Sequence, residues 1–410
     1  MGLNETVSAE RVHISFFGRR NAGKSSLVNA VTGQNLAVVS DVKGTTTDPV
    51  KKSMELLPIG PVVIIDTPGF DDEGALGELR VQKTREILAK TDVAVLVLDA
   101  TEEMGAQEQE FLALLQEKKL PFVVVKNKVD LVEEIEEKLA ASANGANQNA
   151  YHELYVSATK NINIKELKDL IGSLAKTKEN NKKIVADLLE PGDVVILVTP
   201  IDESAPKGRL ILPQQQTIRD AIDAGCMAFV CQDTELPQTL ASLVKPPKMV
   251  ITDSQAFGRV SKMVPENIPL TSFSILFARY KGDLATQVKG AAMLSKLQDG
   301  DKILIAEGCT HHRQCGDIGT VKLPNWIQKF SNAKVQIDFT SGGEFPADLS
   351  EYKLVVHCGG CMLNEAEMKH RISLAKEADV PMTNYGVAIA HVNGILKRSL
   401  ELFPEVLNLL

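Results

Sequence analysis

Short apolar runs alternate with helix-like stretches along the N-terminal part of the chain, up to Ala175. Runs of strand length occupy Val12–Phe17, Val62–Asp66, Val93–Asp99 and Pro121–Val125. Between the last two runs, the apolar positions of Gln107–Lys118 fall on one helix face. Strands that alternate with helices predict a mostly parallel sheet with right-handed crossovers. The chain is therefore expected to begin with an α/β domain.

A charged, apolar-poor break, Lys-Thr-Lys-Glu-Asn-Asn-Lys-Lys, covers residues 176–183 and is typical of a domain boundary. Strand and helix signals resume beyond it, with a softer boundary near residue 264. The pattern predicts an α/β protein in which the N-terminal domain is followed by two smaller α/β domains. The expected limits are 1–175 for the first domain, 176–184 for a linker, 185–264 for the middle domain and 265–410 for the third.

Composition narrows the class of protein. With 44% hydrophobic and 24% charged residues in 410, the chain is typical of globular proteins and not of disordered ones. A net charge of −8 and 5% aromatic residues argue against a nucleic-acid partner. The apolar runs are far shorter than the roughly 20 residues needed to span a bilayer, and residues 1–15 lack the layout of a signal peptide. We therefore expect a cytoplasmic protein with no membrane partner.

The strongest motif is a phosphate-binding loop. Gly18-Arg-Arg-Asn-Ala-Gly23-Lys24-Ser25 matches G-x-x-x-x-G-K-[ST] and lies where a predicted strand gives way to a helix. In such a loop the backbone N–H groups point at phosphate oxygens and the helix N-terminus favours negative charge. Lys24 is expected to reach the β and γ phosphates, and Ser25 to offer its hydroxyl to Mg²⁺.

Four further polar segments follow in the order that a GTP-hydrolysing domain needs. They are Gly44–Asp48, Asp66–Gly69, Asn127–Asp130 and Ser157–Thr159. The first offers a second hydroxyl to the metal, the second a carboxylate in its outer shell, and the fourth closes over the base. The carboxylate of Asp130 suits the ring N–H and the exocyclic amine of guanine, so the site should reject ATP. Each segment alone is a weak signal, but together, near the ends of predicted strands, they are specific.

The residues expected to act on the nucleotide follow from these motifs. Lys24, Thr46 and Asp66 are the expected catalytic residues, with Ser25 and Thr46 as Mg²⁺ ligands. The other expected GTP-binding residues are Gly18, Asn21, Ala22, Gly23, Ser26, Gly69, Asn127, Lys128, Asp130, Ser157 and Ala158.

With these motifs, the expected first domain resembles the translation-factor-related GTPases, a class that includes the tRNA-modifying and ribosome-assembly G proteins such as MnmE and Era. Phe70 stands where small signalling GTPases place a water-orienting glutamine, so hydrolysis should be slow or use another group. Asn21 and the Gly44–Asp48 segment resemble the potassium-stimulated members of the class. That resemblance implies K⁺ as a further cofactor, with Asn21 as a candidate K⁺ ligand.

Four of the six cysteines fall between residues 309 and 361, which indicates metal or redox chemistry. Cys309 and His311 follow the predicted strand Lys302–Ala306, and His357-Cys358-Gly-Gly-Cys361 follows the predicted strand Tyr352–Val356. Both groups are thus expected at the carboxyl edge of one sheet. Three thiolates with nearby imidazoles suit either zinc or an iron–sulfur cluster. His311 and His357 are candidate ligands, with a structural role as the alternative for each.

Behind an N-terminal GTPase domain, a Cys-x-His motif followed at a distance by His-Cys-x-x-Cys resembles the HydF family of FeFe-hydrogenase maturation proteins, and the resemblance covers the full chain. The resemblance implies a GTPase and scaffold with a dimerising middle domain and a C-terminal cluster-binding domain. It implies a 4Fe–4S cluster on Cys309, Cys358 and Cys361, with His311 or His357 as a candidate fourth ligand. The cargo would be a di-iron precursor made by two radical-SAM maturases and passed to apo FeFe-hydrogenase.

Two alternatives stay open. A ribosome- or tRNA-linked GTPase with a structural zinc site would need a basic surface in the C-terminal third of the chain, and the acidic net charge argues against it. A GTP-regulated redox enzyme would need acid–base residues beside its cluster.

Overall fold

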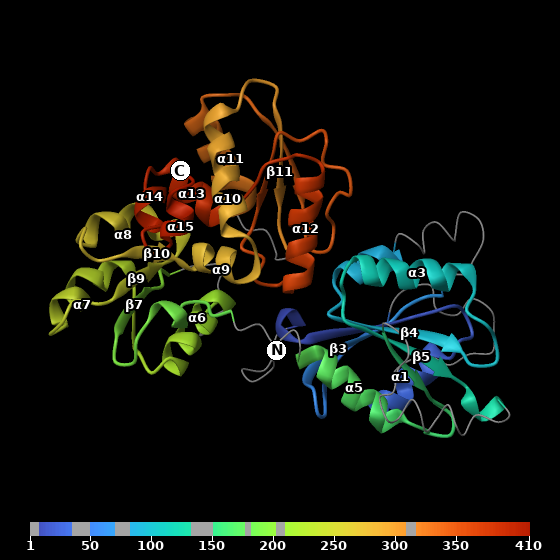
Figure 1. Ribbon diagram of the computed structural model, residues 1–410. Helices are drawn as coiled ribbons and strands as arrows, with labels where there is room; N and C mark the ends of the chain where they lie inside the picture. The colour runs from blue at the N-terminus through green and yellow to red at the C-terminus, as the bar shows by residue number, and fades with distance from the viewer. Residues whose placement is uncertain are drawn as a thin grey trace. The chain divides into compact units, whose positions relative to one another are not determined.

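The computed structural model describes residues 8–34, 50–69, 83–132, 151–176, 182–201, 210–308 and 317–410. The chain divides into two compact units, residues 1–180 and 181–410 (Figure 1). Among the described residues, the first unit holds one sheet and the second unit holds two. No helix in the described ranges combines the length and the apolar character that crossing a membrane requires.

The first unit is built on a six-stranded sheet with the order β2-β3-β1-β4-β5-β6. Its strands are β1 (Val12–Phe17), β2 (Val50–Leu56), β3 (Gly60–Asp66), β4 (Val93–Asp99), β5 (Phe122–Asn127) and β6 (His152–Tyr155). Among these described strands, β2 alone runs antiparallel to its neighbour. The mostly parallel sheet expected from the alternating pattern is thus confirmed.

Helices cover both faces of this sheet. On one face, α1 (Lys24–Thr32) and α5 (Ile164–Lys176) share a core with β1, β3, β4 and β5. On the other face, α3 (Ala106–Glu117) packs together with Ile87 and Leu88. Because both faces are covered, the central strands read as continuous apolar runs without alternation.

The second unit begins with a four-stranded parallel sheet in the order β10-β9-β7-β8. Its strands are β7 (Val194–Val198), β8 (Met227–Cys231), β9 (Met249–Thr252) and β10 (Leu270–Ser272). The helices of this part are α6 (Leu212–Asp223), α7 (Leu236–Ser242), α8 (Phe257–Met263) and α9 (Phe273–Lys281). We call these four strands the middle sheet. The sheet extends past residue 264, because β10 belongs to it.

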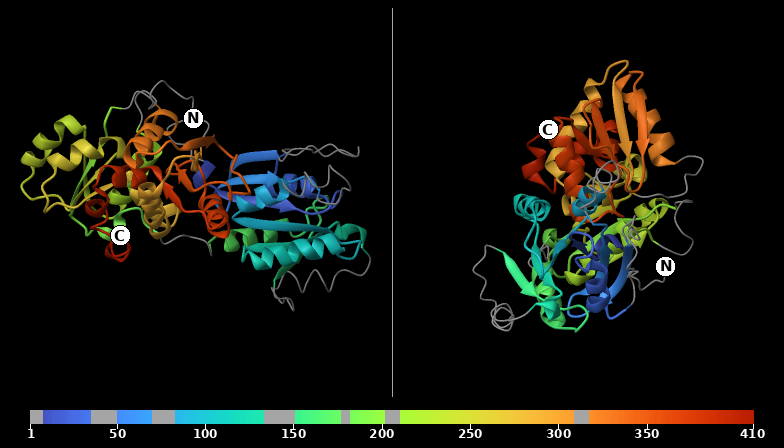
Figure 2. Two further views of the ribbon diagram at one scale, coloured as in Figure 1. Left: turned by 90° about the horizontal axis from the view of Figure 1, so that it is seen from above. Right: turned by 90° about the vertical axis from the view of Figure 1, so that its right-hand side faces the viewer.

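A second four-stranded parallel sheet, the C-terminal sheet, has the order β12-β11-β13-β14. Its strands are β11 (Lys302–Ala306), β12 (Gln336–Thr340), β13 (Leu354–His357) and β14 (Met382–Asn384). The accompanying helices are α10 (Leu284–Ala291), α11 (Leu323–Ser331), α12 (Glu365–Glu377), α13 (Tyr385–Val392), α14 (Leu396–Ser399) and α15 (Pro404–Leu407). These two sheets confirm the expected α/β class beyond the first domain (Figure 2).

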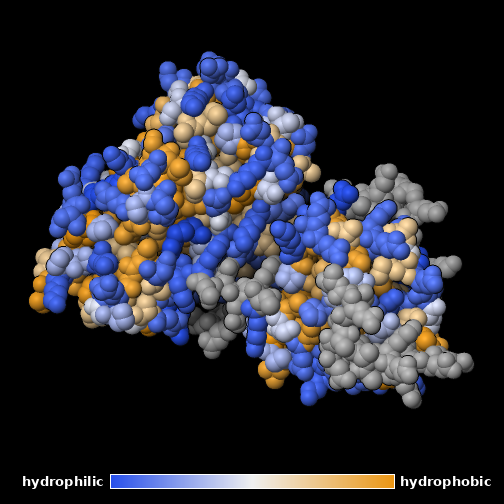
Figure 3. All heavy atoms as spheres, in the orientation of Figure 1, coloured by the Kyte–Doolittle hydropathy of each residue, from blue (hydrophilic) through white to orange (hydrophobic). Residues whose placement is uncertain are grey.

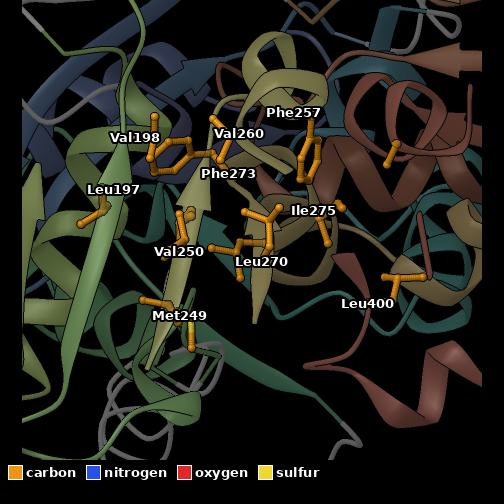
Figure 4. Close-up of a cluster of buried hydrophobic side chains, with 14 of the residues drawn as sticks. Leu197, Val198, Met249, Val250, Phe257, Val260, Leu270, Phe273, Ile275 and Leu400 are labelled. Atoms are coloured by element: carbon orange, nitrogen blue, oxygen red, sulfur yellow. The ribbon is translucent and has the colours of Figure 1, made fainter. Parts of the chain in front are cut away.

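The largest core of the second unit joins distant parts of the chain. Leu197 on β7, Val250 on β9 and Leu270 on β10 are buried with Leu400, which lies near the C-terminal end (Figure 4). Phe403 and Val406 belong to the same core. The last helices of the chain therefore pack on the middle sheet, so this core is completed only when the C-terminal residues fold.

Candidate functional site

The phosphate-binding loop joins β1 to α1 and requires glycine at two positions. Gly18 has φ 150°, and a Cβ there would collide with the Val97 carbonyl oxygen. Gly23 has φ 87°, and a Cβ there would collide with the side-chain amide of Asn127. The two glycines of the motif therefore stand at the two positions where the loop has no room for a side chain.

Lys24 is buried at the start of α1, although a lysine side chain is usually exposed. Its Nζ donates hydrogen bonds to the carbonyl oxygens of Gly18 at 2.9 Å and Arg19 at 2.7 Å. The ammonium group is therefore held inside the loop, where a phosphate would lie. Ala22 is buried, and Asn21 is exposed in the left-handed region at φ 60°.

Ser25 and Asp66, which are far apart in the sequence, meet at the carboxyl end of β3. The Ser25 hydroxyl donates to Asp66 Oδ2 at 2.6 Å. Burial raises the pKa of Asp66, while this hydrogen bond and the charge of Lys24 act against the rise. The other oxygen, Oδ1, is buried and has no hydrogen-bond donor among the described residues. An orphaned carboxylate oxygen beside a serine hydroxyl fits Mg²⁺, which prefers oxygen ligands.

Asn127 ties the base-recognition segments to the phosphate-binding loop. Its Nδ2 donates to the Ala22 carbonyl oxygen at 3.1 Å, and its Oδ1 accepts from the Ala158 N–H at 3.1 Å. A cavity of about 430 Å³ lies beside Ser26, Ala158 and Thr159. Together with the Ser25–Asp66 contact, these bonds bring four of the five predicted segments to one edge of the sheet.

Asp130 and Ser157 complete these segments in different ways. Asp130 is exposed in the turn Val129–Leu131 after β5, whereas Ser157 is buried and its Oγ accepts from the Lys160 N–H at 3.0 Å. Lys128 has φ 66° and pairs with Asp99 at 2.6 Å. Thr46, the rest of Gly44–Asp48, and Phe70 lie outside the described residues.

Sequence reasoning missed two acidic residues that pair with lysine or arginine of the predicted nucleotide site, Asp99 and Glu108. Asp99 pairs with Lys128 and is the last residue of β4. Because ligand sites in such sheets lie at the carboxyl ends of strands, this position could have indicated its role. Arg19 in the phosphate-binding loop pairs with Glu108 at 2.9 Å and with Glu102 at 3.1 Å. Glu108 is buried at the start of α3 and also accepts from the Gly105 N–H, a tertiary role that no motif reports.

The second candidate site is the loop Cys358–Cys361 between β13 and α12, which we call the cysteine loop. Cys358 Sγ accepts hydrogen bonds from the backbone N–H groups of Gly308 at 3.0 Å and Gly360 at 3.4 Å. Burial raises the pKa of Cys358 to about 11, and these two N–H groups act against the rise. Gly308 follows the end of β11, so the ends of neighbouring strands meet at this sulfur.

Glycine and asparagine fix the shape of this loop. Gly360 has φ 65°, a conformation that side chains other than glycine rarely adopt. Asn364 caps α12, with its Oδ1 accepting from the Glu367 N–H at 3.0 Å. The chain turns at the two glycines of Cys-Gly-Gly-Cys, and α12 begins at Glu365, right after its cap.

His357 lies beneath the cysteine loop and is completely buried. Arg371 donates to His357 Nε2 at 3.0 Å, so Nδ1 carries the proton and donates to the Cys358 carbonyl oxygen at 2.8 Å. Burial and the charge of Arg371 lower the pKa of His357 to about 3. Both ring nitrogens are engaged, which leaves neither for a metal in this arrangement.

Arg371 is the largest completely buried side chain in the described residues. Its Nη2 donates to Glu367 at 2.7 Å and to the Gly342 carbonyl oxygen at 2.7 Å, and its guanidinium lies 5.0 Å from the Phe345 ring centroid. Glu367 and Arg371 lie one helical turn apart on α12, but their burial could not be foreseen from the sequence. Together these groups hold His357 in one orientation.

The remaining predicted metal ligands lie outside the described ranges. Cys309 and His311 fall within residues 309–316, which the structure does not describe. Among the residues that it does describe, no three His, Cys, Asp or Glu side chains form a group able to hold a metal ion. Cys226 precedes β8 and Cys231 is its last residue, and both are buried.

The parallel sheet, the glycine-dependent loop and the Ser25–Asp66 pair define a P-loop GTPase domain. The family model for 50S ribosome-binding GTPases matches residues 13–128. Two further models match the rest of the chain: the hydrogen maturase F dimerization domain over residues 184–282, and the hydrogen maturase F tetramerization domain over residues 285–402. The chain belongs to the hydrogen maturase F (HydF) family, and the resemblance stated from the sequence is confirmed.

Individual relatives are named as GTPases. GTPase Era of Heliobacterium modesticaldum is 31% identical over 223 residues, which are 48% of this chain and 74% of that protein. The tRNA modification GTPase MnmE of Clostridioides difficile is 33% identical over 174 residues, 42% of this chain but 36% of that protein. The structure of Aquifex aeolicus Era bound to GDP·AlF4⁻ is 18% identical, with a TM-score of 0.35, and covers 54% of this chain and 94% of that one.

Proposed function

We propose that this hydrogenase-maturation GTPase is a scaffold that binds a 4Fe–4S cluster and carries a di-iron precursor to apo FeFe-hydrogenase. The family membership supports maturation and GTP hydrolysis, and the models for dimerization and tetramerization domains support an oligomer. The scaffold role, the homodimer, the radical-SAM maturases and hydrogenase as partners, and a cytoplasmic location are parts of the proposal. No nucleic-acid partner is included.

In the GTPase part, the residues act mainly by position and charge. Lys24 is held to stabilise charge on the β and γ phosphates, and Ser25 with Asp66 is arranged to receive Mg²⁺. Asp130 reads the guanine edge. Thr46 as a second Mg²⁺ ligand and Asn21 as a K⁺ ligand complete the proposed site. The phosphoryl group is transferred to water, which yields GDP and phosphate.

The cluster site is proposed on Cys309, Cys358 and Cys361, with His311 as a candidate fourth ligand and His357 in a positioning role. The observation that carries it is the Cys358 sulfur, which accepts two backbone N–H bonds, one of them from Gly308, the residue before Cys309. Backbone N–H groups directed at a thiolate sulfur are a common setting of iron–sulfur ligands. A bound cluster would offer an iron atom able to take an external ligand.

The test compares Cys358→Ala with the wild-type chain and with Cys226→Ala, a buried free cysteine of the middle sheet, as the matched control. After anaerobic purification and reconstitution, iron, acid-labile sulfide and zinc are counted per chain, and GTP hydrolysis is measured. We expect Cys358→Ala to lose most of its iron and sulfide while hydrolysing GTP within about twofold of the wild type. A folded Cys358→Ala protein that keeps its iron, or wild-type protein that holds only zinc, would contradict the proposal.

A further inference from the structure

Lys281, the last residue of α9, is a buried lysine that reaches the cysteine loop from outside it. Its residue exposure is 4%. Its Nζ donates to the carbonyl oxygens of Cys361 at 3.1 Å and Leu363 at 3.0 Å. Removing an ammonium group from water is costly, so a lysine buried at this depth indicates a specific role for its charge.

The helix that carries Lys281 belongs to the middle sheet. Ser272 caps α9, with its Oγ accepting from the Ile275 N–H at 3.2 Å. Phe273 and Ile275 are buried in the core that holds Val198 and Val250 (Figure 4). The match to the dimerization-domain model ends at residue 282. Lys281 is thus a side chain of the dimerization domain that holds a loop of the following domain.

The charge of Lys281 lies directly beside one of the two cysteines, because its Nζ is 3.1 Å from the backbone oxygen of Cys361. A second tie joins the same regions, because Lys376 on α12 pairs with Asp283, the cap of α10, at 2.8 Å. Unlike Lys281, Lys376 is exposed and makes its contact away from the cysteine loop.

From these contacts we infer that Lys281 is a positioning residue for the cysteine loop, and that its positive charge favours the reduced state of a cluster bound there. This inference rests on the proposed function. A 4Fe–4S cluster held by thiolates becomes more negative when it accepts one electron, so a fixed cation nearby stabilises the reduced form. The two carbonyl contacts fix the loop, and the dimerization domain thereby contributes to the metal site.

The charge is tested by the midpoint potential of the full-length, reconstituted protein, titrated with dithionite and followed by electron paramagnetic resonance. Lys281→Gln keeps a hydrogen-bond donor but removes the charge, Lys281→Arg keeps the charge, and Lys376→Gln is the control. We expect Lys281→Gln to lower the equilibrium constant for reduction about tenfold, or about 59 mV for one electron. Lys281→Arg and Lys376→Gln should remain within about threefold of the wild type. A Lys281→Gln potential equal to that of the wild type overturns the electrostatic role.

The positioning role is tested on the metal-free protein by amide hydrogen exchange over residues 358–364. Lys281→Met should speed exchange in this segment about tenfold or more while β13 and β11 stay protected, and Lys376→Met should not. An exchange rate in Lys281→Met equal to that of the wild type overturns the positioning role. This holds even if the variants take up no iron, because the measurement uses metal-free protein. Wild-type protein that never binds iron would instead refute the proposed function, and the exchange result would still decide the positioning role.

Discussion

At the residue scale, we propose that base specificity depends on Asp130. It stands exposed in the turn after β5, where it can meet a ligand edge. Asp130→Asn should weaken GTP binding about 100-fold or more, because two charge-assisted hydrogen bonds are lost. The variant should gain affinity for xanthosine triphosphate, whose C2 carbonyl accepts from the new amide.

Binding titrations with GTP and xanthosine triphosphate check this prediction. Asp169→Asn is the control, because Asp169 is exposed on α5. If both variants bind GTP equally well, Asp130 does not read the base.

The buried His357 makes a prediction about pH. Its pKa falls to about 3 in the folded protein, whereas an unfolded chain takes up a proton below about pH 6.5. The stabilisation that comes from keeping His357 neutral is therefore fully present above about pH 6.5. It is lost progressively as the pH falls from there toward 3. At about pH 5 this loss amounts to about 2 kcal/mol, and a His357→Gln variant should lack it.

Urea unfolding of the metal-free protein measures the difference, with fluorescence of Trp326 as the probe. Trp326 is the only tryptophan of the chain and packs against the core of the C-terminal sheet. The wild-type free energy of unfolding should fall by about 2 kcal/mol more than that of the variant between about pH 7.5 and pH 5. Equal changes in both proteins would mean that His357 is not held neutral.

The placement of residues was predictable where a motif fixes both identity and spacing. The motifs predicted that Ser25 and Asp66 act at one place, and they are hydrogen-bonded. His357 was expected as a candidate metal ligand because the sequence does not reveal its partner, Arg371. Arginine side chains usually lie at the surface, and the burial of this one follows from its contacts with Gly342 and Glu367.

At the element scale, β8 is an edge strand with an apolar surface. It pairs with β7 on one side, and no other described strand pairs with it. Met227, Phe229 and Val230 are 51%, 40% and 45% exposed. On the face drawn in Figure 3, apolar residues lie among polar ones over the second unit. Exposed apolar edges favour pairing with another strand, so we expect β8 to form part of the dimer contact.

Phe229→Lys should therefore weaken dimerization about tenfold or more, because it places a charge on that edge. Val244→Lys is the control, since Val244 is fully exposed in the loop after α7. Sedimentation equilibrium measures the dimer dissociation constant. An unchanged constant in Phe229→Lys would place the contact elsewhere.

Long apolar runs made the central strands predictable, whereas the edge strands β2, β10 and β14 were missed. β4 and β5 match their runs almost to the residue because both faces are buried. β2 was not predicted, since most of its residues are exposed and its pattern is largely polar. β10 and β14 are too short to give a pattern, and tertiary pairing with β9 and β13 defines them.

At the scale of the whole molecule, the nucleotide site and the cysteine loop lie in different compact units. Lys24→Ala should lower kcat/KM for GTP about 100-fold or more, because a positioned cation is lost from the phosphate site. Iron content should stay within about 20% of the wild type, since each unit has its own core. Steady-state hydrolysis and iron analysis on the same preparation measure both, and a folded variant that loses both would show that the sites are coupled.

The most direct measurement is the spin count of the dithionite-reduced, full-length protein by electron paramagnetic resonance, made on the wild type, Cys309→Ala and Cys358→Ala. Two separate stretches of chain, one after β11 and one after β13, are proposed to share one cluster. The account predicts about one spin per wild-type chain with a 4Fe–4S signature and less than about a tenth of that in either variant. A wild-type protein without such a signal, or a Cys309→Ala protein that retains all of it, would contradict the account.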